Sequence, residues 1–204
     1  MKTIVIFGVL ILLTACAPTF SELQSARTVG KDKVEFTPSF SAVQFASDGQ
    51  INSVQNHVGL QLAFGLSDKL DFRLRTEYIW LTDEFSNGIG MIGFGPKYNF
   101  VLNRVSFYLP IGRAVGQDTG DTWGMHPTLL LTQPLLKEKV ELTLSPKYLF
   151  PFCKDCSDLI AVNLGLAFSS KISNWSIRPE FGVLCNPQDQ GVYTQFSFGF
   201  SRRF

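Results

Sequence analysis

The sequence predicts an all-β fold, in which about ten antiparallel strands form an up-and-down barrel that crosses a membrane. Three observations favour this fold. Apolar and polar residues alternate with a period of two throughout residues 33–204, and the links between these segments are alternately short and long. The apolar face also carries bulky side chains on nearly every segment. The same region has no stretch with the apolar spacing of an amphipathic helix.

Composition excludes several classes of protein. The 204 residues include 18 Lys+Arg and 17 Asp+Glu, a formal net charge of +1, and no basic run suggests a nucleic-acid partner. Hydrophobic residues make up 45% and charged residues 17%, which excludes a disordered chain. The longest apolar run, residues 4–13, is too short for a spanning helix, which needs about 20 residues. Strands must therefore carry any membrane crossing by the mature chain.

The amino terminus has the layout of a secretory signal peptide. Met1-Lys2 is a short positive start, residues 4–13 are apolar, and Thr14-Ala15 are small residues before Cys16. We therefore assign residues 1–15 to the signal. Residues 16–32 are polar and aperiodic, and we expect them to form a periplasmic tether ahead of a barrel domain at 33–204.

Leu13-Thr14-Ala15-Cys16 resembles the lipobox of bacterial lipoproteins. The resemblance implies a diacylglycerol on Cys16 and cleavage just before it, and Ala17 then implies the outer membrane. Two or three acyl chains anchor a protein stably in lipid, whereas one chain holds only marginally. Ordinary signal cleavage beside an incidental cysteine is the alternative.

Ten segments alternate between apolar and polar residues. In one of them, Leu70, Phe72 and Leu74 alternate with Asp71 and Arg73. Each segment has at least the 9–11 residues or so that a tilted strand needs to cross a bilayer. The predicted strands are 33–45, 57–67, 69–82, 88–100, 104–115, 122–133, 139–151, 158–169, 175–185 and 191–204.

The links follow the pattern of periplasmic turns and external loops. The short links are 67–69, 102–103, 136–139 and 170–174. The longer links, generally richer in Gly, Asp and Asn, are 46–56, 83–87, 115–121 and 152–158. Because the strand number is even, we expect both termini in the periplasm, where a lipid on Cys16 would enter the inner leaflet.

Alternation alone also fits a soluble barrel with its apolar face inward. Three details favour the membrane: lipid accepts bulky side chains that a narrow lumen does not, aromatic residues lie near strand ends, and the last strand ends at Phe204. That strand resembles the carboxyl-terminal signal read by the barrel-assembly machinery, although Arg202 stands where an apolar residue is expected. The aromatic residues are Trp80, Trp123, Trp175, Tyr78, Tyr98 and Tyr148.

A family resemblance extends over essentially the whole mature chain. Stretches of this sequence resemble the small outer-membrane barrel proteins of Bacteroidetes-type bacteria, many of which begin with a lipobox. The stretches are GLSDKLDFRLRTEYI, IGFGPKYNF, VSFYLPIGRAVGQD, HPTLLLTQPL, LTLSPKYLFP, NLGLAFSS and IRPEFGVL. The resemblance implies fold and location, and no defined activity.

Prolines are the awkward feature of the strand prediction, because a proline cannot donate to a sheet ladder. Five fall inside predicted strands, and bulges or kinks would accommodate them. They are Pro38, Pro96, Pro127, Pro146 and Pro179.

If Phe and Leu face lipid, charged residues face the lumen. The lumen charge network expected from this pattern comprises Arg73, Arg75, Glu77, Lys97, Glu141, Lys147, Arg178 and Glu180, with Glu35, Asp71, Arg104 and Arg203 also inward. One interpretation is a lumen closed by its own ion pairs, in an outer-membrane protein with a structural or interaction role. The other is a narrow channel or transporter for small anionic solutes, lined by Arg73, Arg75 and Arg178.

An enzyme acting on lipid A or peptides is a third possibility, but no catalytic motif is present and we expect no enzymatic activity, cofactor or metal. His57 and His126 are expected to face inward. Carboxylates in the outer loops are Asp83, Glu84, Asp118 and Asp121.

Three cysteines are expected at the outer strand ends, in an oxidising compartment. Cys153–Cys156 is one possible disulfide, and a bridge from either residue to Cys185 is the other. A metal site that joins them to His126 rests on a lone CxxC, which is weak.

Overall fold

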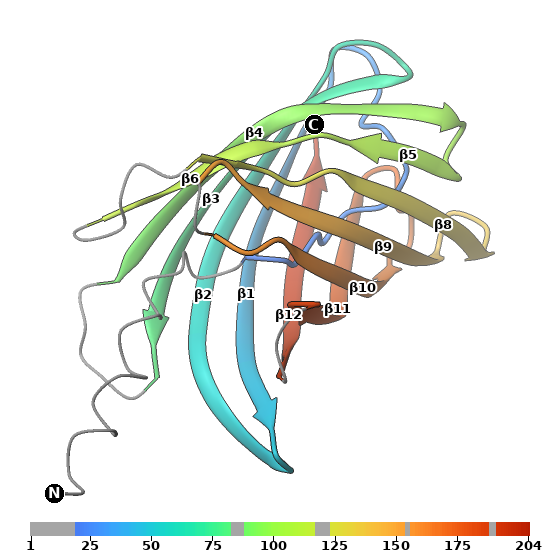
Figure 1. The fold of residues 1–204 in the computed structure, drawn as a ribbon. Coiled ribbons are helices and arrows are strands. Elements are labelled where there is room, and N and C mark those ends of the chain that lie inside the picture. Colours follow the sequence, from blue (N-terminus) through green and yellow to red (C-terminus); the bar gives the residue numbers. More distant parts are fainter. Residues whose placement is uncertain (1–18, 83–87, 117–122, 154–155, 188–190) are drawn as a thin grey trace, which may run out of the picture.

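The structure is a computed structural model that describes residues 19–82, 88–116, 123–153, 156–187 and 191–204. Within these residues every regular element is a strand, and the predicted antiparallel ten-stranded barrel is confirmed (Figure 1). The described residues include no helix that is long and apolar enough to cross a membrane.

Twelve strand segments build the ten barrel strands. Two barrel strands are each interrupted once, so β5 and β6 form one strand that breaks at Leu109-Pro110, and β7 and β8 form another that breaks at His126-Pro127. The segments are β1 (Val34–Ser47), β2 (Gln50–Gly65), β3 (Leu70–Leu81), β4 (Ile89–Val101), β5 (Val105–Tyr108), β6 (Ile111–Val115), β7 (Trp123–Met125), β8 (Thr128–Leu136), β9 (Val140–Pro151), β10 (Leu159–Phe168), β11 (Trp175–Cys185) and β12 (Val192–Arg203).

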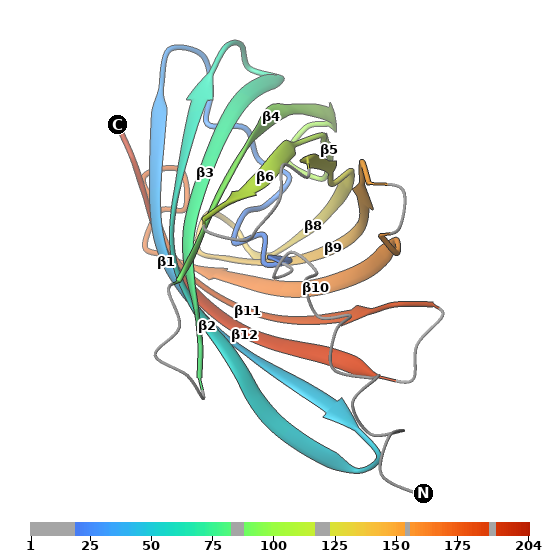
Figure 2. The same cartoon turned by 60° about the vertical axis from the view of Figure 1, so that its left-hand side comes forward.

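The first and last strands close the ring. β1 pairs antiparallel with β12 from Glu35 opposite Arg203 to Ala46 opposite Val192. Val34 and Phe204 exchange backbone hydrogen bonds of 3.2 and 2.9 Å at one end of this seam. Among the described residues every barrel strand therefore pairs with a neighbour on both sides, which closes the ring (Figure 2).

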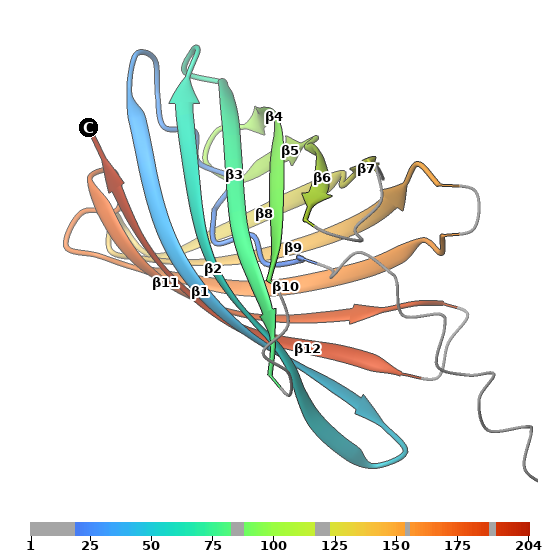
Figure 3. The same ribbon diagram turned by 90° about the vertical axis from the view of Figure 1, so that its left-hand side faces the viewer.

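The predicted strand boundaries hold closely except at the first connection. The link predicted at 46–56 is wrong, because β1 and β2 run on to a turn at Asp48 and Gly49. Both turn residues have positive φ, 51° and 77°, as the two-residue turns that join twisted hairpins require. The β1–β2 hairpin consequently projects past its neighbours at one end of the barrel (Figure 3).

Each proline inside a continuous strand lies where pairing is interrupted on one side only. Pro38 pairs with Leu60 of β2, while the register with β12 skips it. Pro179 pairs with Phe198 of β12, while the register with β10 skips it. A proline supplies no N–H, so the ladder on one side is lost and the other is kept. Pro127 instead lies in the break between β7 and β8.

The two ends of the barrel differ in their connections. We call the end with links 66–69, 102–104, 137–139 and 169–174 the short-turn rim. The opposite end, which carries the β1–β2 turn and the other links, is the long-loop rim.

The outer surface is apolar along the strands. Phe36, Phe40, Phe181, Phe196 and Phe198 are each exposed, whereas Thr37 and Ser197, which lie between them on β1 and β12, are buried. Aromatic pairs lie near both rims: Tyr78 with Trp80 at the long-loop rim, and Tyr98 with Phe100 at the short-turn rim. This is the arrangement of a barrel whose outside meets lipid.

The largest difference from the sequence prediction concerns residues 19–29, which we call the lumen segment. The segment expected to be part of a polar tether instead lies inside the barrel, with every residue except Arg27 buried (Figure 2). A narrow barrel with a polar, charged interior leaves hydrogen-bonding groups without water, and a chain backbone can satisfy them.

The lumen segment runs from one rim toward the other. Thr19 Oγ1 lies 2.5 Å from Sδ of Met91, which is close to the long-loop rim. Val29 contacts Asp71, which is close to the short-turn rim where the chain enters β1. The first described residue, Thr19, and Phe204 therefore lie toward opposite ends of the barrel. Residues 1–18, on which the expected side of the amino terminus depends, lie outside the described residues.

Candidate functional site: the filled lumen

The candidate site is the barrel interior. Alternation along each strand sends one set of side chains inward, and the structure places the whole predicted lumen charge network there. All eight members are buried: Arg73, Arg75, Glu77, Lys97, Glu141, Lys147, Arg178 and Glu180. Glu35 and Asp71 are buried beside them, whereas Arg104 lies at the exposed rim and contacts Gln133.

One group of ion pairs lies toward the short-turn rim. Arg73 Nη2 is 3.3 Å from Glu35 and 3.7 Å from Asp71. Lys97 Nζ is 3.3 Å from Asp71, and Arg203 Nη2 is 2.8 Å from Glu35. Each carboxylate is thus shared by two cations from different strands, which compensates charges that water cannot reach.

A second group lies toward the long-loop rim. Arg75 Nε donates to Glu77 at 2.7 Å, and His57 Nδ1 lies 3.1 Å from the other Glu77 oxygen. Lys147 Nζ is 2.5 Å from Glu22 of the lumen segment. Because His57 is committed to a buried carboxylate, the geometry gives it no exposed position from which to act on a substrate.

The lumen segment contributes two charged residues that sequence reasoning missed. Besides the Glu22–Lys147 pair, Arg27 contacts Glu141 of β9 and donates to Glu138 at 2.9 Å. Glu141 was predicted to face inward, but its partner could not be identified from strand patterns, because Arg27 lies outside every strand.

Side chains of the barrel wall form hydrogen bonds with both the N–H and the C=O groups of the segment's backbone. Its N–H groups donate to acids and hydroxyls: Glu22 and Leu23 to Glu180 at 2.7 and 2.8 Å, and Ala26 to Thr132 at 2.8 Å. The two carboxylate oxygens of Glu180 therefore accept from two successive N–H groups of the segment.

The carbonyl groups of the segment accept hydrogen bonds from basic, amide and hydroxyl side chains of the wall. Phe20 O accepts from Asn163 at 2.6 Å and from Lys147 at 3.3 Å. Ala26 O accepts from Asn99 at 2.6 Å and from Ser106 at 2.5 Å. Gln61, Arg75 and Lys97 also donate to backbone carbonyls of the segment. The side chains that bind the segment therefore come from strands around most of the barrel.

Glycines on the wall make room for the segment. A Cβ at Gly182 would collide with Asn163 and lie 3.0 Å from the Phe20 ring. A Cβ at Gly199 would lie 3.3 Å from Leu23, and one at Gly65 would collide with the backbone of Gly30, the residue that follows the segment. The wall and the segment are thus complementary in shape as well as in hydrogen bonding.

A small cavity remains beside the lumen segment. A cavity lined by Leu23, Arg178 and Glu180, among others, has room for about one water molecule. Arg178 itself donates to Ser201 Oγ at 2.9 Å. The three arginines proposed as an anion path therefore all have acceptors on the wall, and the lumen segment occupies the axis that a solute would use.

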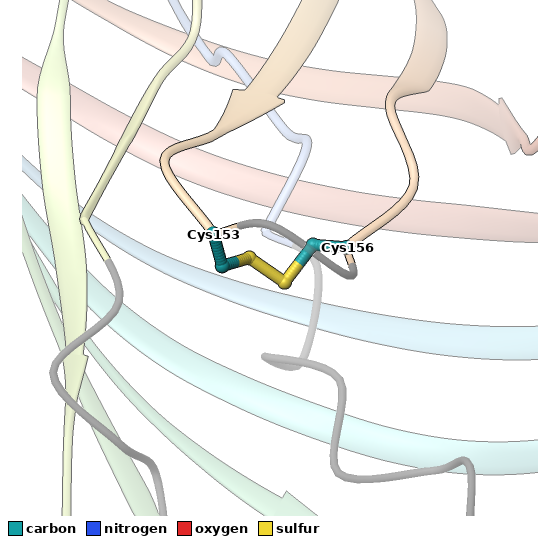
Figure 4. Close-up of a disulfide and its surroundings, with 2 residues drawn as sticks. All are labelled: Cys153 and Cys156. Carbon is teal, nitrogen blue, oxygen red and sulfur yellow. A yellow bond between two sulfur atoms is a disulfide. The ribbon is translucent and has the colours of Figure 1, made fainter.

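The cysteines are resolved as one bridge and one thiol. Cys153 and Cys156 form a disulfide across the link between β9 and β10, with Cα atoms 5.5 Å apart (Figure 4). Cys185, at the end of β11, is a free thiol. Within the described ranges no group of three or more His, Cys, Asp and Glu side chains is placed to hold a metal ion. Asp83, Glu84, Asp118 and Asp121 lie outside the described residues.

Neither sequence comparison identifies a relative. No family model matches the chain, and no curated protein sequence matches it.

Solved structures, in contrast, match over most of the chain. An outer membrane channel from Pseudomonas putida F1 is 7% identical with a TM-score of 0.54, covering 91% of this chain and all of its own. The attachment invasion locus protein of Yersinia pestis is 12% identical with a TM-score of 0.42, covering 85% of this chain and 99% of its own. At such identities the channel establishes the fold alone. The protein therefore has the fold of bacterial outer-membrane β-barrels.

Proposed function

We propose that this protein is a lipid-anchored outer-membrane barrel with a closed lumen, and that its role is structural or one of interaction at the membrane. The observation that carries the proposal is the lumen segment, whose backbone is hydrogen-bonded by side chains from strands around the ring. A solute would have to displace these bonds and the buried ion pairs. The apolar outer surface supports the location in a membrane.

The orientation and anchor belong to the same proposal. Short turns face the periplasm in outer-membrane barrels and longer loops face outward, so the short-turn rim is proposed to be periplasmic. The lipobox resemblance supports acylation of Cys16, and the Bacteroidetes-type resemblance supports the outer membrane. The apolar face of β12, with Phe204 after it, supports recognition by the barrel-assembly machinery.

A passive anion channel is the less favoured function. Arg73 and Arg75 are paired with Glu35 and Glu77, and Arg178 donates to a serine, so none of the three presents an open positive site. We likewise propose no enzymatic activity, since His57 is buried against Glu77.

Planar-bilayer conductance of the purified protein tests the proposal, alongside its migration on gels before and after boiling. We expect a compact, fast-migrating form that is lost on boiling, together with no steady conductance. Steady anion-selective conductance that falls in an Arg73→Ala, Arg75→Ala variant would replace the closed barrel with the channel. Metabolic acyl labelling tests the anchor, and label that persists in Cys16→Ser would overturn it.

A further inference from the structure

The course of the lumen segment sets where the preceding residues emerge. Read backward from Lys33, the chain passes the Gly65 backbone and Asp71 at the short-turn rim. It then passes Thr132 and Asn99, and reaches Glu180 and Lys147. It ends at Thr19 beside Met91 near the long-loop rim. The segment therefore traverses the lumen in one direction without turning back.

The end of this path is fixed by an apolar anchor. Phe20 is fully buried in a cluster with Val43, Leu149, Ala161 and Leu184. Leu149, Ala161 and Leu184 each lie within two residues of the end of their strand at the long-loop rim, and Val43 lies in β1, which runs on past this level. The space left by Gly182 receives the Phe20 ring, and both donors to the Phe20 carbonyl hold the adjacent backbone. The wall thus specifies both the passage and its far end.

We propose that the barrel carries its own amino-terminal segment through the membrane, so that Cys16 and its acyl chains lie on the side of the long loops. Under the proposed orientation the lipid enters the outer leaflet. This inference rests on the proposed acylation and orientation, and it replaces the inner leaflet that an even strand number alone would suggest.

Chain length supports the placement. Cys16 is three residues before Thr19, and an extended chain spans at most about 3.6 Å per residue, so Cys16 can lie at most about 11 Å from Thr19. Crossing back to the short-turn rim would require the length of a strand, about 30 Å for the hydrocarbon core. The path back is also occupied by the segment itself.

The experiment uses the full chain with a site for a specific protease inserted between Ala17 and Pro18, which leaves the lipobox and the residue after Cys16 unchanged. Cells are labelled with an acyl-chain probe, and the protease is added outside intact cells. We expect the barrel to lose nearly all its acyl label, because the cut separates Cys16 from the barrel. Label that is lost only after the outer membrane is permeabilised would overturn the inference.

Two matched variants separate this inference from the proposals beneath it. The same site is inserted between Asp48 and Gly49 at the long-loop rim, or between Ser170 and Lys171 at the short-turn rim. All four of these residues are exposed. Cleavage of the first in intact cells, and of the second only after permeabilisation, supports the orientation. The reverse pattern would overturn the proposed orientation. Whichever side the long loops face, the site after Ala17 should be cut under the same conditions as the site after Asp48 if the segment traverses the lumen.

Acylation is scored independently of these sites. If the barrel carries no acyl label before protease is added, the anchor proposal fails. Cleavage at the Ala17 site is then detected as a change in the size of the protein, which still shows on which side of the membrane this site lies. An Ala17 site that is cut together with the Ser170 site, and apart from the Asp48 site, would show that the segment does not traverse the lumen.

Discussion

At the residue scale, the lumen is stabilised by charges that are compensated only within the protein. Glu22 and Lys147 are the clearest pair, because both are nearly fully buried and they join the lumen segment to β9. Removing one partner of a buried pair leaves an uncompensated charge and typically costs about 3–5 kcal/mol, whereas replacing both partners costs much less.

We therefore expect Lys147→Met to lower the free energy of unfolding by about 3–5 kcal/mol. Adding Glu22→Gln to Lys147→Met should recover most of that loss. Urea unfolding of the protein in lipid vesicles measures the four proteins of the cycle. Losses that simply add in the double variant would show that the two side chains do not interact.

The glycine at position 182 gives a second prediction. Gly182→Ala places a methyl group against Asn163 and Phe20, and Asn163 cannot move without losing its bond to the Phe20 carbonyl. We expect a loss of about 1–3 kcal/mol, as for other overpacked interiors. Gly93→Ala is the matched control, because its Cβ would make only an ordinary contact at 3.5 Å. Equal melting temperatures of the two variants would contradict a close fit between Gly182 and the Phe20 side chain.

At the element scale, the hairpins follow from patterns that the sequence displays. Phe72 and Leu74 face outward and Arg73 and Arg75 inward because the period of a strand is two, so the inward network could be predicted from alternation alone. The extension of β1 and β2 could not be predicted from alternation, because residues 50–56 carry few bulky apolar side chains. There the Asp48-Gly49 turn sets the pairing, and a short turn signal is easily read as part of a loop.

The bridge between β9 and β10 gives an element-scale prediction. Under denaturing, non-reducing conditions, alkylation should label Cys185 and leave Cys153 and Cys156 unlabelled, and reduction should expose both. Peptide mass spectrometry reads out the three positions. A linked peptide containing Cys185 would show that the bridge joins different strands instead.

At the scale of the whole molecule, the barrel is a polar interior enclosed by an apolar surface. The lumen segment is the part that the sequence did not reveal, and the reason is physical. Most of its contacts are made by backbone N–H and C=O groups, which are the same for every sequence and leave no pattern. Glu22 and Arg27 lie in a segment without periodicity, so the sequence does not distinguish them from exposed polar residues. The only sequence feature consistent with a filled lumen is the presence of inward glycines such as Gly182.

The apolar surface gives a prediction that depends on the bilayer. Phe198 lies mid-strand in β12 with its ring outward, so Phe198→Arg should cost about 2–4 kcal/mol when the protein unfolds from lipid. Leu102→Arg, in a turn at the short-turn rim, should cost only about 0–1 kcal/mol. Folding free energies in vesicles of one lipid compare the two. Similar costs would indicate that this face does not meet hydrocarbon.

The seam between β1 and β12 has a consequence for the order in which the molecule is made. The lumen segment leads directly into β1, and β12 is the last of the described strands along the chain, so the ring can be completed only after β12 has been made. A chain end bearing acyl groups or a folded tag could not be drawn through a ring whose interior is this tightly filled. We therefore expect the sheet to wrap around the segment, so that the strands pair along it before the seam joins.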